Sequence, residues 1–272
     1  MNRIKGGNVY QNEYQKRCQA ARDAFASRKV VNELFNEEVD PKLMKLFMIS
    51  WSALSSGLTQ PIPEYLKRAG ENCAKKGVAE MAAFFAQHTE EEDGHDEWGR
   101  DDTRKLVERW NKEEPEFPLN AEDMLKNNMS PAVKRYHKLH ENVIDGDSPW
   151  AELAIDVEIE LITTQYGPRL LQSCVRSMGE DSLADVSFLR EHVRFDVGHT
   201  ETNFETIHKL ITKHPEYTDA LVETAFKALE SYADFLDDAM SSAKKIFKQI
   251  SASVPLGFGA TSKKVPISLE TD

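Results

Sequence analysis

The sequence predicts an all-α protein of a single domain, and three observations support this fold class. The 13 Gly and 11 Pro residues make up about 9 % of the 272-residue chain, below the usual value of about 12 %, so turns are few and elements are long. Apolar residues recur at helical spacing through most of the sequence. No Pro-, Gly- or Ser-rich linker divides it. We therefore expect a bundle of about seven to eight helices over residues 1–250 and a flexible C-terminal tail over 251–272.

Each expected helix is bounded by residues that start or stop helices. The apolar periodicity places the helices near 11–35, 41–56, 61–75, 77–112, 120–145, 149–176, 181–213 and 215–249. The breaks between them, in chain order, are Asp40-Pro41, Pro61 to Pro63, Gly77, Pro115 to Pro118, Asp145 to Pro149, Gly179 to Ser182 and His214-Pro215. The residues after about 250 carry no periodicity, which is why a tail is expected there.

The charge balance restricts the classes of partner. The chain carries 46 acidic and 34 basic side chains, for a formal net charge of −12. Nucleic acids and anionic membranes repel an acidic surface, so neither is expected as a partner. No segment approaches the about 18 consecutive apolar residues of a membrane span, and the N-terminal segment lacks the apolar core of a signal peptide. We therefore expect a cytoplasmic protein, in which the widely spaced Cys18, Cys73 and Cys174 remain reduced.

Three side chains able to bind metal recur on one face of the helix expected near 181–213. The segment FLREHVRFDVGHTETNF places His192, Asp196 and His199 at positions i, i+4 and i+7. At about 100° per residue, these positions fall within about 60° of one another around the helix. The apolar residues Leu189 and Phe195 lie on or beside this stripe, which favours a stripe that faces the core.

The same pattern occurs a second time, in the helix expected near 77–112. There the segment AQHTEEEDGHDEW contains His88, Glu92 and His95. Composition alone gives an expectation of roughly 0.04 for one such match in the chain, so two matches are not an accident. For each motif, the ordinary alternative is an exposed polar stripe on the helix. A stripe that faces the core buries its carboxylates instead, and buried carboxylates require a cation, which a metal ion supplies. Carboxylate and imidazole ligands without thiolates favour iron or manganese over structural zinc.

A third set of carboxylates lies on the helix expected near 149–176, which is apolar around much of its circumference. Its first half carries Glu152, Asp156, Glu158 and Glu160. Glu152 and Asp156 are explained by the positive N-terminal end of the helix. Glu158 and Glu160 remain as candidates for an inward-facing ligand, because di-iron bundles combine Glu-x-x-His elements with Glu residues from other helices.

These motifs together resemble the haem-oxygenase-like di-iron oxidases and oxygenases, over about residues 25–245. That family has Glu-x-x-His on one core helix, a Glu on a second, and His-x3-Asp-x2-His on a third. The resemblance implies a haem-oxygenase-like helical bundle, and Glu158 remains an alternative to Glu160 as the middle ligand. His88 is a departure from part of the family, and we interpret it as a group that orients Glu92 or as an alternative ligand. The metal ligands implied are Glu92, His95, Glu160, His192, Asp196 and His199.

The same resemblance implies an Fe(II)- and O2-dependent oxidoreductase, with two Fe(II) ions per chain as cofactor and O2 as co-substrate. Beyond the metal ligands, no catalytic residue is assigned. The expected substrate is a small molecule bearing a carboxylate, which is desaturated, cleaved at a C–C bond or oxygenated at nitrogen. An amino acid is favoured because Thr and Gln residues follow Glu160, while Arg169 and Arg194 are interpreted as surface charges. A homodimer and an external electron donor are also considered as partners.

Three alternatives are weighed against this interpretation. The first is a fatty-acid oxidative decarboxylase of the same family. The second is an iron-binding bundle without catalysis, and the third is a metal-free, thiaminase-like enzyme with a Cys nucleophile. The remaining histidines are expected to be solvated, and they are His137, His140, His208 and His214.

Overall fold

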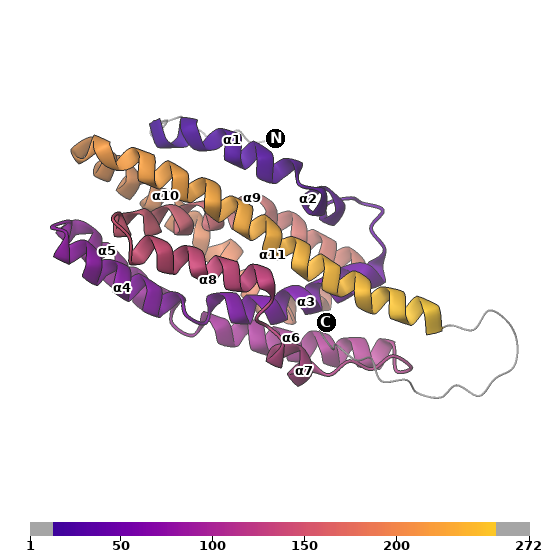
Figure 1. Ribbon diagram of the computed structural model, residues 1–272. Helices are drawn as coiled ribbons and strands as arrows, with labels where there is room; N and C mark the ends of the chain where they lie inside the picture. The colour runs from indigo at the N-terminus through magenta and orange to yellow at the C-terminus, as the bar shows by residue number, and fades with distance from the viewer. Residues whose placement is uncertain (1–12, 254–272) are drawn as a thin grey trace, which may run out of the picture.

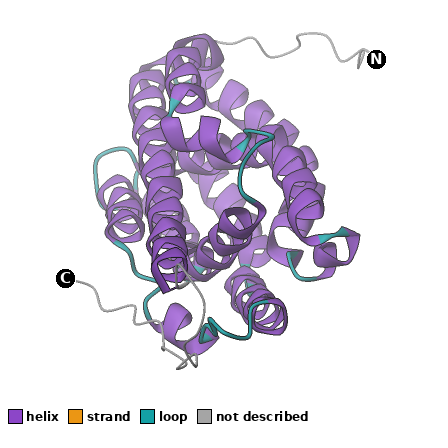
Figure 2. Ribbon diagram, turned by 90° about the vertical axis from the view of Figure 1, so that its right-hand side faces the viewer, coloured by secondary structure: helices purple, strands orange, loops and turns teal. Residues whose placement is uncertain are grey.

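The computed structural model describes residues 13–253 as an assembly of helices, and no strand occurs in this range (Figures 1 and 2). The predicted all-α class is therefore confirmed. Residues 1–12 and 254–272 lie outside the described part, and this includes most of the expected tail. Residues 251–253 belong to the last helix rather than to the tail. No helix of the described part is long and apolar enough to cross a membrane.

The helices follow the expected segments closely, with three of the segments divided in two. In chain order the α-helices are α1 (Glu13–Ser27), α2 (Lys29–Leu34), α3 (Pro41–Thr59), α4 (Ile62–Lys75), α5 (Ala79–Glu92), α6 (His95–Glu113), α7 (Ala121–Lys126), α8 (Pro131–Ile144), α9 (Glu152–Met178), α10 (Ser187–Lys213) and α11 (Thr218–Ser253). Short 3₁₀ turns precede α9, α10 and α11 at Pro149–Ala151, Glu180–Ala184 and Pro215–Tyr217. The divided segments are those expected at 11–35, 77–112 and 120–145.

The break between α5 and α6 changes the interpretation of one motif. Gly94 has a backbone φ of +81°, a left-handed conformation that glycine adopts without strain, and it ends the expected continuous helix. Glu92 is the last residue of α5 and His95 is the first of α6. The two side chains are therefore brought together by a turn, not by their spacing along one helix.

Helix α3 forms the centre of the bundle and packs against α6, α9 and α11 (Figure 1). From Leu46 to Leu58 all its residues are buried, which fits a helix with apolar or small side chains on all sides. The pair α9 and α10 lies against this core. A Cβ on Gly167 of α9 would come within 2.3 Å of Val193 Cγ2 of α10, so the absence of a side chain lets these two helices approach.

The start of α10 is fixed by a residue from another helix. Asp102 of α6 is fully buried and accepts hydrogen bonds from the Ser187 hydroxyl (2.6 Å) and the Phe188 backbone N–H (2.7 Å). No side chain at the N-cap position of α10 makes such a bond. Asp102 therefore supplies the N-terminal cap that α10 lacks, and it fixes the turn that leads to His192.

Candidate metal centre

The first group of candidate ligands joins the end of α5, the start of α6 and α10. Each of Glu92, His95 and His192 offers one ligand atom, and these three atoms lie within 4.8 Å of one another. His95 Nδ1 lies 2.9 Å from Glu92 Oε2. His192 Nδ1 is 2.7 Å from the backbone oxygen of Phe188 and donates a hydrogen bond to it. That bond places the proton on Nδ1 and leaves the lone pair of Nε2 available to a metal ion.

The second group joins α9 and α10. Ligand atoms of Glu160, Asp196 and His199 also lie within 4.8 Å of one another. His199 Nδ1 is 3.6 Å from Glu160 Oε1 and 4.0 Å from Asp196 Oδ1. Asn203 donates a hydrogen bond of 2.6 Å to the other oxygen of Glu160. The Glu160 Oε1 and His199 Nδ1 atoms are buried without a hydrogen-bond partner in the described structure, so both remain free for a ligand.

His88 lies beside the second group, although its spacing in the sequence connects it with Glu92. Its Nε2 atom is 3.6 Å from Glu160 Oε1, and its Nδ1 atom is 3.1 Å from Glu91 Oε2. Both ring nitrogens therefore face carboxylates other than Glu92, and the role of His88 as an orienting group or as an alternative ligand stays a prediction. Glu91 was not a sequence candidate, yet its carboxylate is 3.9 Å from His199 Nε2. Its position directly before Glu92 in the motif is the only signal that could have indicated it.

Glu158 lies on a different side of α9 and is fully buried in an ion pair. Arg22 donates two hydrogen bonds to its carboxylate, at 2.8 and 2.7 Å, and the Tyr14 hydroxyl donates another at 2.8 Å. These contacts attach α1 to α9. Of the two candidates on α9, Glu160 therefore faces the histidine groups and Glu158 serves the packing of the helices.

The two groups differ in the protons that they hold. Burial raises the pKa of Glu92, but the hydrogen bond and charge of His95, together with His192, outweigh this and lower it to about 2. Burial lowers the pKa of His192, which keeps it neutral. In the second group, burial and then the charge of Glu160 raise the pKa of Asp196 to about 9. The first group is therefore ready to bind a cation at neutral pH, whereas the second must release a proton.

His199 adds to this difference. The nearby Glu160 carboxylate raises the pKa of His199 to about 9, although burial acts in the opposite direction. Burial also raises the pKa of Glu160 itself. An imidazolium in contact with a buried carboxylate partly replaces the positive charge that a metal ion would supply. Without a metal, the second group holds its charge balance with protons.

One interpretation of a buried polar residue from the sequence is wrong. His140 is expected in solvent, but it is fully buried and hydrogen-bonded through Nδ1 to Glu152 Oε1. Glu152 is the first residue of α9, as expected for a carboxylate at the helix N-terminus, and it is also fully buried. Asp156, one turn further along α9, also points inward, since it lines the cavity described below and its Oδ2 atom is shielded from solvent. Of the other histidines expected in solvent, His137 is half-buried with Nε2 3.2 Å from the Leu58 oxygen.

The remaining surface assignments agree largely with the structure. His208 is exposed, and Arg194 is exposed over the ring of Phe195. Phe195 itself is 41 % exposed, so it does not support an inward-facing stripe as expected. Arg169 is also exposed, with its guanidinium 4.4 Å from the centre of the Phe35 ring.

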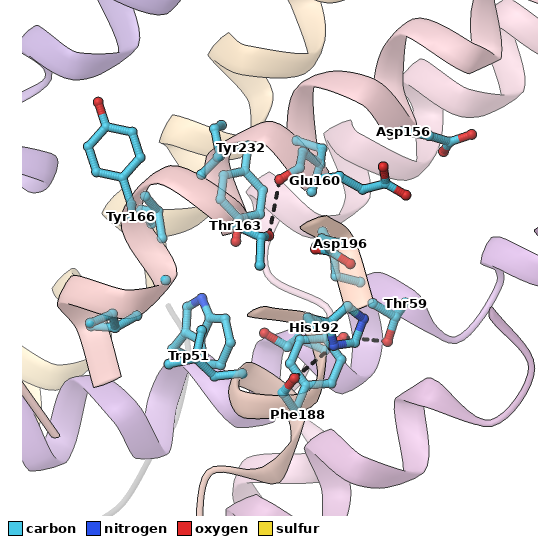
Figure 3. Close-up of a pocket in the computed structure, with 18 of the residues that line it drawn as sticks. Trp51, Thr59, Asp156, Glu160, Thr163, Tyr166, Phe188, His192, Asp196 and Tyr232 are labelled. Atoms are coloured by element: carbon cyan, nitrogen blue, oxygen red, sulfur yellow. Dashed lines mark hydrogen bonds between the residues drawn. The ribbon is translucent and has the colours of Figure 1, made fainter. Parts of the chain in front are cut away.

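A cavity of about 130 Å³ connects both groups to the centre of the bundle. Glu92, His192, Glu160 and Asp196 line it at one end, and Figure 3 shows Tyr166 toward the other. Most of the remaining wall is aliphatic or aromatic. It includes Phe25, Leu34, Phe35, Trp51, Leu58, Ile162, Leu170, Phe188, Leu189, Tyr232 and Leu236. The arrangement is a polar, titratable end and an apolar body, as in many small-molecule sites.

Comparison with solved structures identifies the architecture. No protein-family model and no curated protein matches the chain in sequence. A domain of unknown function with a haem oxygenase-like fold from Shewanella denitrificans OS217 is similar with a TM-score of 0.68 at 19 % identity, covering 90 % of this chain and 96 % of that one. A TenA homologue from Pseudomonas syringae pv. tomato str. DC3000 has a TM-score of 0.61 at 14 % identity, covering 86 % and 93 %. The chain therefore has a haem oxygenase-like fold, as the sequence resemblance implies.

Proposed function

We propose that this protein is a non-haem di-iron enzyme that uses O2 to oxidise a small molecule bound in the central cavity. The observation that carries the proposal is the pair of three-residue groups at one end of that cavity, each with carboxylate and imidazole donors within 4.8 Å. Imidazole and carboxylate donors without a thiolate suit iron. Two Fe(II) ions would supply the activation of O2, which a protein side chain does not provide.

The residues of the chain also fit two divalent ions in their charge and hydrogen bonding. Glu92, Glu160 and Asp196 are largely or fully buried, and Asp156 adds a fourth shielded carboxyl nearby. Uncompensated carboxylates at this depth are costly, and the raised pKa values of Glu160 and Asp196 express that cost. Bound cations would remove it.

Around such ions, the protein would orient ligands and exclude water. The Phe188 carbonyl holds the His192 ring so that Nε2 is the free nitrogen. Asn203 holds one oxygen of Glu160 and leaves the other free. The apolar wall shields a substrate from solvent and places it against the two groups.

The thiaminase-like alternative lacks a suitable nucleophile. Cys18, Cys73 and Cys174 are all buried, and none lines the cavity. Burial raises the pKa of each thiol to about 12, so the reactive thiolate is absent at neutral pH. The similarity to a TenA homologue is therefore interpreted as one of fold.

The lining of the cavity favours the second substrate candidate, a fatty acid, over an amino acid. The preference for an amino acid rested on polar residues after Glu160, but only Thr163 of these lines the cavity, while Gln165 is exposed. An aliphatic and aromatic wall matches an alkyl chain, because burial of apolar surface drives its binding. The carboxylate of such a substrate would meet the metal end.

Anaerobic titration with Fe(II) tests the proposal. We expect two ions per chain in the wild type and a loss of one or both in His199→Ala, since that substitution removes a donor from the second group. His208→Ala is the matched control, because His208 is an exposed histidine on the same helix. Exposure of the loaded protein to O2 with saturated fatty acids or amino acids, followed by O2 uptake, then identifies the substrate class. Absence of iron binding in the wild type, or equal stoichiometry in both variants, would refute the proposal.

A further inference from the structure

We propose that Phe35, Tyr166 and Arg169 form the entrance of the central cavity, where the Phe35 ring closes the opening and Arg169 attracts the carboxylate of the substrate. The inference rests on the proposed function, because it assigns the route by which the substrate reaches that cavity. None of the three residues is a candidate ligand, and Figure 3 shows Tyr166 apart from the labelled carboxylates.

The ring of Phe35 lies between the cavity and solvent. Phe35 follows directly after α2, and its side chain lines the cavity while it remains partly exposed. The next residues, Asn36, Glu37 and Glu38, are exposed. On α9, Arg169 is exposed, and its guanidinium carbon lies 4.4 Å from the centre of the Phe35 ring. One aromatic ring therefore separates an exposed cation from the interior of the cavity.

Weak side-chain contacts hold this ring in the closed position. The Phe35 and Tyr166 rings are stacked, with 5.5 Å between their centres and 25° between their planes. Tyr166 also meets Phe25 of α1 edge-on at 5.8 Å, and both of these residues line the cavity. A ring stack and a cation–π contact at an exposed site are each weak, so thermal motion is enough to break them.

The backbone that carries the Phe35 ring is attached more firmly than the ring itself. Val31 and Leu34 of α2 are buried and also line the cavity. Glu33 of α2 forms an ion pair of 2.6 Å with Lys244 of α11. Opening therefore requires rotation of the Phe35 side chain rather than displacement of a helix.

The guanidinium of Arg169 is available to an anion. Within residues 13–253 it forms no ion pair, whereas Arg22 pairs with Glu158 and Arg109 with Asp185. The chain as a whole has a net charge of −12, which repels anions. A free guanidinium beside the Phe35 ring makes this point of the surface locally attractive to a carboxylate.

Ordinary packing at the surface does not account for the cluster. Arg194 is also placed over a ring, that of Phe195, but Arg194 forms an ion pair with Glu191, and Phe195 does not line the cavity. The ring under Arg169 is instead part of the cavity wall, and no carboxylate of the described residues pairs with this guanidinium. The combination of a free cation and a wall residue is what an entrance for an anion requires.

The two side chains have separable effects on entry. Arg169 raises the concentration of anions at the opening, so it acts on the association rate of charged ligands alone. Phe35 blocks the opening for every ligand, so it acts on charged and neutral ligands alike. After entry, the apolar wall holds the alkyl chain, whichever ligand has passed.

Stopped-flow binding of octanoate and 1-octanol tests the entrance, because these probes have the same chain length and differ in charge. The full chain is loaded with Fe(II) under anaerobic conditions, and tryptophan fluorescence follows binding, since Trp51 lines the cavity. In Arg169→Gln the association rate constant of octanoate should fall about fivefold at low salt, the factor for one unit charge at about 4 Å in water. The difference should disappear near 1 M salt, and 1-octanol should bind as in the wild type.

Variants of Phe35 test the closing ring. In Phe35→Ala the association and dissociation rate constants of both probes should rise about 10-fold, because the ring stack and the cation–π contact no longer hold the opening closed. Phe35→Trp should lower both rate constants, which a general loss of structure would not do. Phe226→Ala is the matched control, because Phe226 is an exposed phenylalanine outside the cavity.

Arg176→Gln is the control for charge, because Arg176 is an exposed arginine of α9 about two turns beyond Arg169. Equal slowing of octanoate in Arg176→Gln and Arg169→Gln would overturn the role of Arg169. Unchanged rate constants in Phe35→Ala, or no binding of either probe to the wild type, would overturn the entrance. Normal iron stoichiometry in these cases leaves the proposed di-iron centre intact. If the wild type binds no iron, the proposed function fails, and the rate constants of 1-octanol with the metal-free chain still decide the role of Phe35.

Discussion

The substitution Asp196→Asn should stabilise the metal-free protein. The wild-type carboxyl can ionise, but its buried surroundings disfavour the ionised form. Asp196 is 4 % exposed, and its pKa is raised from 3.8 to about 9 by burial and then by the charges of Glu160 and Glu92. A carboxyl whose pKa is higher in the folded state gives stability that is complete at acidic pH. That stability is lost as the pH rises from the unfolded pKa to the folded one.

The size of the effect follows from this pKa difference. Each pH unit between the unfolded and folded pKa values corresponds to about 1.4 kcal/mol. Between pH 3.8 and neutral pH this difference amounts to about 4 kcal/mol. The folded wild type is less stable by that amount, because it keeps a proton on Asp196 that the unfolded chain has already released. Asparagine has the same shape and no proton to lose. We therefore expect Asp196→Asn to be more stable by up to about 4 kcal/mol at neutral pH and equal to the wild type near pH 4.

Urea unfolding followed by circular dichroism, with a chelator present, measures this difference at several pH values between about 4 and 9. Glu201→Gln is the control, because Glu201 is an exposed carboxylate on the same helix. The raised pKa of His199 leaves some pH dependence above about 6.5 in every variant. A stability of Asp196→Asn equal to or below that of the wild type at neutral pH would refute the electrostatic account. A difference that does not shrink toward acidic pH would do the same.

Two further predictions concern the packing of α9. Gly167→Val should lower the free energy of unfolding by about 1–3 kcal/mol and reduce metal binding, because a Cβ would lie 2.3 Å from Val193 and push α9 away from α10. Thermal unfolding of Gly167→Val and of Thr164→Val gives the comparison. Equal melting temperatures of the two variants would contradict the prediction. Glu158→Ala should lower the free energy of unfolding by about 3–5 kcal/mol, because the largely buried Arg22 guanidinium loses its partner. Urea unfolding measures this loss. A loss below about 1 kcal/mol would place the ion pair among weak surface contacts.

The fold class and most of the candidate centre follow from local sequence patterns. Apolar periodicity depends on the geometry of a single helix, so eight helical segments could be placed without knowledge of their neighbours. His192, Asp196 and His199 share a stripe for the same reason. The pairing of Glu92 with His95 was also anticipated, although its basis was wrong, because a turn at Gly94 rather than a continuous helix brings them together.

Other features depend on contacts that no local pattern contains. The choice between Glu158 and Glu160 is one, since the two lie about 200° apart on a helix that is buried on both sides. Periodicity shows that both face protein, but only the tertiary structure shows that one meets Arg22 and the other His199. The cap of α10 by Asp102, 86 residues before Phe188, is of the same kind.

The sequence by itself determined which helices form and which side chains share a helix face, because both properties are set by the 3.6-residue geometry of one helix. The tertiary structure decided which faces meet. It joined Glu160 to His88 and His199, placed Glu152 and His140 in a buried pair, and enclosed the apolar cavity beside them. The physical reason is that the periodicity of a helix fixes directions around its own axis, while the partner in each direction depends on the packing of all the other helices.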